Sequence, residues 1–220
     1  MPKSTVHLLR HGEVQNPDRI LYGRIPGYGL SELGMEMAER AGKYFGEQAA
    51  EGAKLVRLVA SPLLRAQQTA APTAAALELP ILTDERVIEA GNRFEGLSRI
   101  ANRLREPRYW PYIINPLKPS WGEPYSEQVD RMRLAMQEHR RAAVAEAGDG
   151  AEVVIVSHQL PIWVTRRASQ GQRLWHDPRQ RECTLTSITS FEFSDDQLVN
   201  LSYHEPCADL LAGAANIPGA

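Results

Sequence analysis

The sequence has few cysteines and no long apolar run. Cys183 and Cys207 are its two cysteines, and they lack the CxxC spacing of metal or redox sites. A membrane-spanning helix needs roughly eighteen consecutive apolar residues, and no such run is present. The apolar stretch near the N-terminus is also too short for a signal peptide. We therefore expect reduced thiols and a cytoplasmic protein.

An excess of charge of one sign is also missing. The 220 residues include 25 Lys and Arg against 27 Asp and Glu, which gives a formal net charge of −2. Partners such as nucleic acid or an anionic membrane favour a basic excess, so we expect neither. Because there is no His-Glu-x-x-His segment and no cluster of aspartates, we expect no metal and no other cofactor.

What the chain does have is an alternation of strand and helix patterns. Apolar runs predict strands at residues 5–9, 55–60, 81–82 and 152–156, with helical patterns at 31–50, 62–70 and 125–147 between them. This order predicts an α/β fold, a three-layer sandwich in which helices cover both faces of a mostly parallel sheet. Residues 186–193 and 198–203 flank a turn and predict an antiparallel hairpin at one edge.

Composition also suggests where the domain ends. We interpret residues 1–206 as a single domain and the Ala- and Gly-rich residues 207–220 as a flexible tail. Residues 97–125 are rich in aromatic side chains and proline, which favours a cap inserted over a site. A loop packed on the core is the alternative. Ser61 and Pro62 have the residue types of an N-cap and a first helical position, so we expect a helix to begin there.

Polar residues follow three of the predicted strands. Arg10 and His11 come after the first strand, residues 61–65 after the second, and Ser157 and His158 after the strand at residues 152–156. In open α/β sheets, ligands bind beyond the carboxyl ends of the strands. We therefore expect these segments, which are distant in sequence, to meet at one edge of the sheet.

These residue types suit phosphate chemistry. The guanidinium groups of Arg10 and Arg65 can match the oxygens of a phosphate ester. His11 can act as a nucleophile when neutral, and nearby arginines disfavour its protonated form. His158 could stabilise charge on the phosphate oxygens. Glu89, after the third strand, is the candidate to protonate the leaving group, and its alternative is a structural carboxylate beside an arginine.

Four segments also resemble the histidine phosphatase superfamily, the phosphoglycerate-mutase-like proteins. Residues 9–13 (Leu-Arg-His-Gly-Glu) resemble its Arg-His-Gly motif, and residues 60–70 resemble its second phosphate-binding segment. Residues 87–96 resemble its acid loop, and residues 156–158 (Val-Ser-His) its last motif. The four segments occur in the family's order across most of the chain.

The resemblance implies a phosphohistidine intermediate on His11. It also implies Arg10, Arg65 and His158 as phosphate ligands, and Glu89 as the general acid that then activates water. No metal takes part in this mechanism.

Two further residues are candidates for contact with substrate. Gln159 stands where the family often has glycine after the second histidine, so its side chain could reach the phosphate or the substrate. Asn16 lies five residues beyond His11, whereas the family's asparagine usually lies six beyond its nucleophile. We therefore retain Asn16 and Gln159 as candidate substrate-contacting residues, and the spacing of Asn16 departs from the family pattern.

Three functions remain open from the sequence. The favoured one is a phosphomonoesterase that hydrolyses the phosphate ester of a small metabolite. A mutase would use the same phosphohistidine and return the phosphoryl group to the product. A phospho-ligand binding protein without turnover is the third. A homodimer through an edge strand or the cap is compatible with each of these functions.

Overall fold

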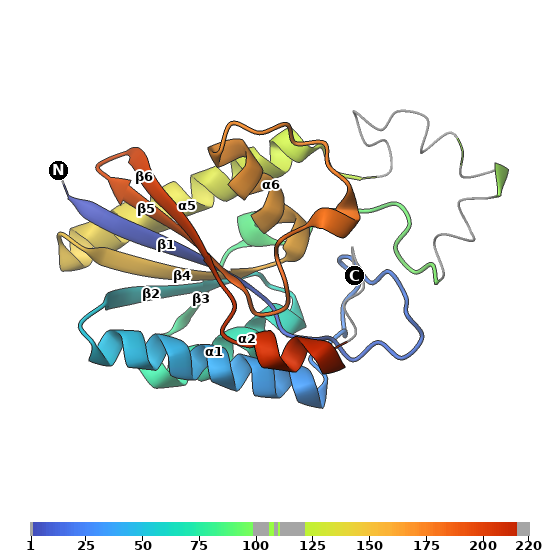
Figure 1. Cartoon of the computed structure of the whole chain (residues 1–220), viewed down its shortest axis with the longest axis horizontal. Helices are drawn as coiled ribbons and strands as arrows, with labels where there is room; N and C mark the ends of the chain where they lie inside the picture. The colour runs from blue at the N-terminus through green and yellow to red at the C-terminus, as the bar shows by residue number, and fades with distance from the viewer. Residues whose placement is uncertain (1, 99–105, 108–109, 111–121, 215–220) are drawn as a thin grey trace.

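A six-stranded sheet lies at the centre of the chain (Figure 1). The computed structural model describes residues 2–98, 106–107, 110 and 122–214. The sheet order is β3-β2-β4-β1-β5-β6. Strands β1 to β4 are parallel to one another, and β5 pairs antiparallel with both β1 and β6. The strands are β1 (Lys3–Arg10), β2 (Lys54–Ala60), β3 (Ile81–Thr83), β4 (Ala151–Ser157), β5 (Ile188–Ser194) and β6 (Gln197–His204). The predicted parallel sheet with an antiparallel edge is confirmed.

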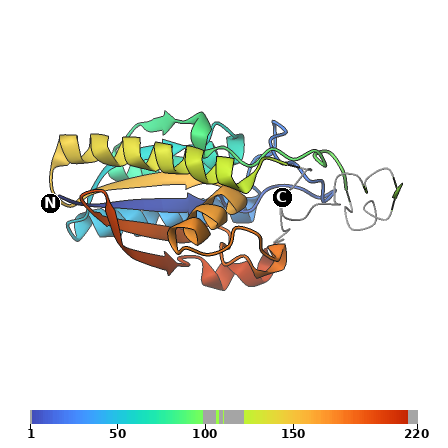
Figure 2. The same cartoon turned by 90° about the horizontal axis from the view of Figure 1, so that it is seen from above.

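Helices cover both faces of this sheet. Figure 1 shows α1 and α2 below the strands and α5 and α6 above them, so that α5 and α6 lie on the near side in the view from above (Figure 2). The helices are α1 (Glu32–Ala50), α2 (Leu64–Leu77), α5 (Tyr125–Ala147) and α6 (Gln159–Ser169), with short 3-10 helices η1 (Glu85–Val87), η3 (Pro178–Gln180) and η4 (Ala208–Gly213). The predicted three-layer sandwich is therefore confirmed.

The central strand β4 shows why helices cover both faces. Its residues Val153 and Ile155 belong to the core on the α5 side, whereas Val154 and Val156 belong to the core on the α1 and α2 side. All four are completely buried. Because successive side chains of a strand point to opposite faces, an unbroken apolar run needs a cover on each side.

The start of α2 differs from the sequence prediction. The helix begins at Leu64 with Leu63 as its N-cap, so Ser61 is not the cap and Pro62 is not the first helical residue. The hydroxyl of Ser61 is instead 2.8 Å from Nε2 of His158, in the adjacent strand end. Pro72 lies inside α2, which continues to Leu77. A tertiary contact at the site has thus replaced the local capping role.

Two predictions concern the ends of the domain. Residues 207–213 do not form a flexible tail, because Cys207 is buried and Leu210 and Leu211 of η4 pack against the cluster around Met37. The predicted cap at residues 97–125 falls largely outside the described residues. Within the described part of the chain, no helix is long and apolar enough to cross a membrane.

Asp84 anchors the turn η1, which leads toward the site. Burial by itself would raise the pKa of Asp84, but hydrogen bonds from the side chain and backbone of Arg86 and from His139 outweigh it and lower the pKa to about 2. The carboxylate is nearly buried, and its Oδ2 lies 2.9 Å from Nε2 of His139 on α5. The turn is thereby tied to α5.

Replacing Asp84 with asparagine should lower the free energy of unfolding near pH 7 by about 2 kcal/mol, since one pKa unit corresponds to about 1.4 kcal/mol. A carboxyl group whose pKa is lowered on folding stabilises the fold at every pH above its pKa in the unfolded chain. That stabilisation should therefore shrink as the pH falls from about 4 toward about 2. Urea unfolding of both proteins at pH 7, 4 and 3 measures this. A difference that stays constant over this range would contradict the assignment.

Candidate active site

The carboxyl ends of the parallel strands bring the predicted site residues together. Arg10 of β1 pairs in register with Ser157 of β4, and Ala60 of β2 pairs with Val156. His11, Ser61 and His158 each follow directly at these ends. The expectation that three distant segments meet at one edge of the sheet is confirmed by this register.

His11 is completely buried and held in one tautomer. Its Nδ1 lies 2.7 Å from the carbonyl oxygen of Gly12, and a carbonyl only accepts, so Nδ1 carries the hydrogen. Burial lowers the pKa of His11 well below its usual value, and the charges of Arg65 and Arg10 lower it further. The ring is therefore neutral near pH 7 and keeps a lone pair on Nε2.

His158 lies against His11 from the neighbouring strand end. The two ring centroids are 5.1 Å apart, with the rings tilted by 59°. Nε2 of His158 is 2.8 Å from the hydroxyl of Ser61, which also accepts a hydrogen bond from the backbone of Leu63. Burial lowers the pKa of His158, and Arg65 and the other nearby charges lower it further. Both histidines are thus neutral.

The two arginines are buried at the same place. Nη1 of Arg10 donates to the carbonyl of Cys183 at 2.7 Å, and Nη2 of Arg65 donates to the carbonyl of Gly23 at 2.7 Å. The Arg65 guanidinium also lies over the ring of Tyr22, 4.6 Å from its centroid. No carboxylate lies within salt-bridge distance of either arginine in the described residues. Two buried positive charges therefore remain for an anion.

Unpaired polar atoms gather in this group of residues. Nε of Arg10, Nε2 of His11, Nε of Arg65 and Nδ1 of His158 are all buried and have no hydrogen-bond partner within the described part of the chain. Buried polar groups without partners are costly, and a native site that keeps several of them has a ligand to satisfy them. An anion with several acceptor oxygens meets this need.

Glu89 lies at the end of the segment that follows η1. It is nearly buried, and its Oε1 accepts a hydrogen bond from the backbone of Ala90 at 2.8 Å. Burial lowers the pKa of Arg65, and the nearby charge of Glu89 opposes that lowering, so the two side chains lie close enough to interact. Arg86 pairs with Asp84 and Glu138, and no ion pair joins it to Glu89 within the described residues. The structural alternative therefore loses one of its proposed partners.

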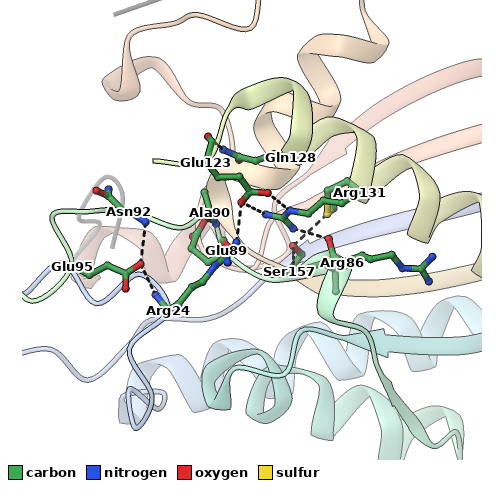
Figure 3. Close-up of polar contacts among 12 residues, drawn as sticks. Arg24, Arg86, Glu89, Ala90, Asn92, Glu95, Glu123, Gln128, Arg131 and Ser157 are labelled. Atoms are coloured by element: carbon green, nitrogen blue, oxygen red, sulfur yellow. Dashed lines mark hydrogen bonds and ion pairs between the residues drawn. The ribbon is translucent and has the colours of Figure 1, made fainter. Parts of the chain in front are cut away.

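Three donors hold the backbone around Glu89 (Figure 3). Nε of Arg24 donates to the carbonyl of Glu89 at 2.7 Å, and Nη1 of Arg131 donates to the carbonyl of Arg86 at 2.6 Å. The hydroxyl of Ser157 donates to the carbonyl of Val87 at 2.7 Å. These donors come from the first loop, from α5 and from β4, so the position of Glu89 depends on tertiary structure.

Glu123 connects two of these donors. Its carboxylate accepts hydrogen bonds from Arg131 at 2.7 and 3.0 Å and from Arg24 at 2.9 Å (Figure 3). Its side chain is 16% exposed. The carboxylate of Glu123 therefore orients both Arg24, which binds the carbonyl of Glu89, and Arg131, which binds the carbonyl of Arg86.

If Glu89 is the general acid of a phosphatase, as the sequence predicts, replacing Glu123 with glutamine should reduce turnover of alkyl phosphate esters roughly tenfold, because a small displacement of such a group is costly. Aryl esters, whose leaving groups need less protonation, should lose much less. Steady-state kinetics on both ester types measures the split. Glu127→Gln, which changes an exposed carboxylate in the first turn of α5, is the matched control. An equal loss on both esters would indicate general destabilisation.

The two predicted substrate-contacting residues have different surroundings. The Asn16 side chain donates to the carbonyl of Ile20 at 2.8 Å and accepts from its backbone nitrogen at 3.0 Å, so it stabilises its own loop. Gln159 is buried, and its Nε2 donates to the carbonyl of Cys183, the same oxygen that Arg10 binds. Gln159 therefore lies beside the arginine pocket, whereas Asn16 is engaged with its loop.

Two further polar residues near the start of the chain have structural partners. His7 lies between Ser190 and Glu152, with both ring nitrogens 2.8 Å from their side-chain oxygens. Glu13 accepts a hydrogen bond from Ser31, the N-cap of α1. Cys183 and Cys207 are both free cysteines, and the described residues contain no group of three or more His, Cys, Asp or Glu side chains that could hold a metal ion.

Sequence reasoning did not find Arg24, Glu123, Arg131 and Arg181. None of the four belongs to one of the four motif segments, and they lie in loops or on α5, at positions that only the fold determines. Arg181 lies close to residues 175–179 (Trp-His-Asp-Pro-Arg), which are rich in polar side chains. Thr69, which accepts a hydrogen bond from the backbone of Gly12, was within a recognised segment but had no assigned role.

This sheet, with two histidines and two arginines buried at the carboxyl ends of its strands, defines an α/β protein with a positively charged pocket suited to an anion. The chain belongs to the histidine phosphatase superfamily, since the model of branch 1 of that superfamily matches residues 6–205. The resemblance seen in the four sequence segments is thereby confirmed.

Two mycobacterial relatives are similar in sequence. The uncharacterized protein Rv0525 of Mycobacterium tuberculosis is 46% identical over 212 residues, which cover 94% of this chain and all of that protein. The bifunctional protein Rv2228c of the same organism is 30% identical over 159 residues, covering 70% of this chain and 41% of that protein.

Solved structures with the same fold include YhfR of Bacillus stearothermophilus. It is 26% identical, with a TM-score of 0.70, over 89% of this chain and 94% of that chain. The mycobacterial glucosyl-3-phosphoglycerate phosphatase Rv2419c, solved in complex with VO3, is 22% identical, with a TM-score of 0.71, over 90% of this chain and 96% of that chain. At that identity the second likeness shows the fold alone.

Proposed function

We propose that this protein is a phosphomonoesterase that hydrolyses a small phosphorylated metabolite through a phosphohistidine on His11, without a metal. The observation that carries the proposal is the state of His11. Its ring is neutral, and its Nδ1 donates a hydrogen bond to the carbonyl oxygen of Gly12. The lone pair of its Nε2 is unengaged beside two buried arginines. An imidazole in this state is an activated nucleophile.

In the first step Nε2 of His11 attacks phosphorus in line with the ester oxygen. The N–P bond forms and the ester P–O bond breaks, while Arg10 and Arg65 balance the charge on the equatorial oxygens. If Ser61 donates to Nε2 of His158, the Nδ1 hydrogen of His158 is left to donate to one of these oxygens. Backbone N–H groups at the start of α6 add positive potential there.

Glu89 is proposed to handle the protons. As a carboxylic acid it gives its proton to the leaving oxygen, so the product departs as an alcohol. As a carboxylate it then takes a proton from water, whose oxygen forms a bond to phosphorus while the N–P bond breaks. Inorganic phosphate and free His11 result. The second step needs only water, so no acceptor substrate has to be held in place.

The test is hydrolysis of a panel of alkyl and aryl phosphomonoesters by the purified protein, with and without EDTA, followed by released phosphate. We expect release from at least one ester at the same rate in both conditions. Release that EDTA abolishes would contradict the metal-independent mechanism. Interconversion of phosphoglycerates with little hydrolysis would indicate a mutase, and binding of esters without turnover would indicate a ligand-binding protein.

The proposal includes the cellular setting expected from the sequence. We place the protein in the cytoplasm with a small phosphorylated metabolite as its partner, and with neither nucleic acid nor membrane as a partner. A homodimer is compatible with this role. The near-neutral charge balance supports a small-molecule partner, because a polyanion would favour a basic surface.

A further inference from the structure

A cavity lies next to Glu89. Its lining includes Glu89, Gly91, Tyr125, Leu160 and Arg181, which belong to the acid segment, the starts of α5 and α6, and the loop before β5. The acid that protonates a leaving group must face that group. The cavity beside Glu89 is therefore where the part of the substrate beyond the ester oxygen would lie.

The charges lining this cavity are not all balanced. Glu123 also lines it, and its carboxylate is engaged by both Arg24 and Arg131. Arg181 has no carboxylate within salt-bridge distance in the described residues. The nearby charge of Glu89 acts on Arg181 without forming an ion pair. Arg181 is therefore the cation of this cavity whose charge no direct partner neutralises.

Neutral groups fix the orientation of Arg181. Its Nε donates to Nε2 of His176 at 2.9 Å, and Nδ1 of His176 donates to the carbonyl of Leu174 at 2.7 Å, which sets the tautomer that accepts from Arg181. Burial lowers the pKa of His176 to about 4, so the ring stays a neutral acceptor near pH 7. Nη1 of Arg181 donates to Oε1 of Gln159 at 3.3 Å.

The remaining terminal nitrogen, Nη2, makes no hydrogen bond within the described part of the chain. A guanidinium held by two neutral acceptors is positioned in advance, and its fork fits the oxygens of a carboxylate or a phosphate. Gln159 connects Arg181 to the pocket of Arg10, because its Oε1 accepts from Arg181 while its Nε2 donates to the carbonyl of Cys183 that Arg10 also binds. Arg181 thus extends the pocket toward the leaving group.

We propose that Arg181 binds a second anionic group on the leaving group of the substrate, a carboxylate or a second phosphate. This inference rests on the proposed phosphatase function. The substrate class is then a phosphomonoester that carries another negative charge a few bonds from its ester oxygen. Gln159 and His176 act as positioning residues for Arg181.

Matched ester pairs test this proposal. 3-Phosphoglycerate and glycerol 3-phosphate differ by a carboxylate in place of a hydroxymethyl group, and O-phosphoserine differs from phosphoethanolamine by a carboxylate. Fructose 1,6-bisphosphate against fructose 6-phosphate tests a second phosphate. We expect the kcat/KM of the wild type to be higher for the more anionic ester, either in the two carboxylate pairs or in the phosphate pair. Which pairs show the preference distinguishes the two anions.

In Arg181→Gln, kcat/KM for the favoured anionic ester should fall about 10-fold to 100-fold, mainly through KM. The ester that lacks the second anionic group should change little. Arg181→Lys keeps the charge and should retain part of the preference. Arg179→Gln is the matched control, since Arg179 is exposed and pairs only with Asp177 within the described residues.

Two results would overturn the inference. An equal loss on both members of a pair would place Arg181 at the transferred phosphoryl group or at Glu89. A wild type without preference would also overturn it. If no ester is hydrolysed, the proposed function fails instead of this inference. Calorimetric binding of 3-phosphoglycerate and glycerol 3-phosphate to wild type and to Arg181→Gln then tests the role of Arg181. Equal affinities of the two proteins for 3-phosphoglycerate would contradict that role.

Discussion

Replacing His11 with alanine is expected to lower kcat/KM at least about 10⁴-fold on every ester that the wild type hydrolyses. Nε2 of His11 is a neutral imidazole nitrogen whose lone pair is unengaged beside both buried arginines, and it is the proposed nucleophile. The change removes the nucleophile itself, so no choice of leaving group should restore the rate. Initial rates of phosphate release, with a good aryl ester and an alkyl ester, measure this loss.

The fold must survive for that result to have meaning. His11 is completely buried, so the variant should be checked by thermal unfolding, and His11→Asn offers a second variant that fills more of the space. His204→Ala is the matched control, because this exposed histidine of β6 stacks on Tyr44 and lies outside the site. Retention of more than a few per cent of wild-type activity in well-folded His11 variants would remove His11 from the mechanism.

The second large effect concerns Glu89. Glu89→Gln should slow alkyl esters by about 10² to 10⁴-fold, the usual range for general acid catalysis. Alkoxides are poor leaving groups and need the proton, whereas aryl oxides depart more readily without it. The first step on aryl esters should therefore be much less affected, and the ratio of the two rates should change.

The kinetic design follows from the two steps. A burst of aryl alcohol followed by slow phosphate release is expected in Glu89→Gln, because the same carboxyl group also activates water. Glu85→Gln, an exposed carboxylate of the same segment, serves as the control. An equal loss on alkyl and aryl esters, without a burst, would argue that Glu89 is not the acid.

Much of this site could be predicted because the sequence marks the ends of its strands. Buried apolar runs stop at Arg10 and at Ser157, and a parallel sheet brings such ends to one edge whatever lies between them. The pairing of Arg10 with Ser157 and of Ala60 with Val156 is the result. The positions of His11 and His158 follow from that pairing.

The parts that could not be predicted depend on contacts between loops. Ser61 has the residue type of a helix cap, yet its hydroxyl bonds to His158. Glu123 belongs to no motif, and its role arises because Arg24 of the first loop and Arg131 of α5 both donate hydrogen bonds to it. The 207–213 segment is compositionally tail-like, but Leu210 and Leu211 find an apolar cluster to cover.

The identity of the nucleophile can be measured most directly by trapping the phosphoenzyme. Wild-type protein is mixed with a hydrolysed, ³²P-labelled ester, quenched within milliseconds to seconds, and mapped by peptide analysis. We expect a phosphoryl group that is stable in alkali, labile in acid and attached to His11, with none in His11→Ala. Efficient hydrolysis without any phosphoenzyme under conditions in which its breakdown is slow, or a phosphoryl group on another residue, would contradict the proposed mechanism.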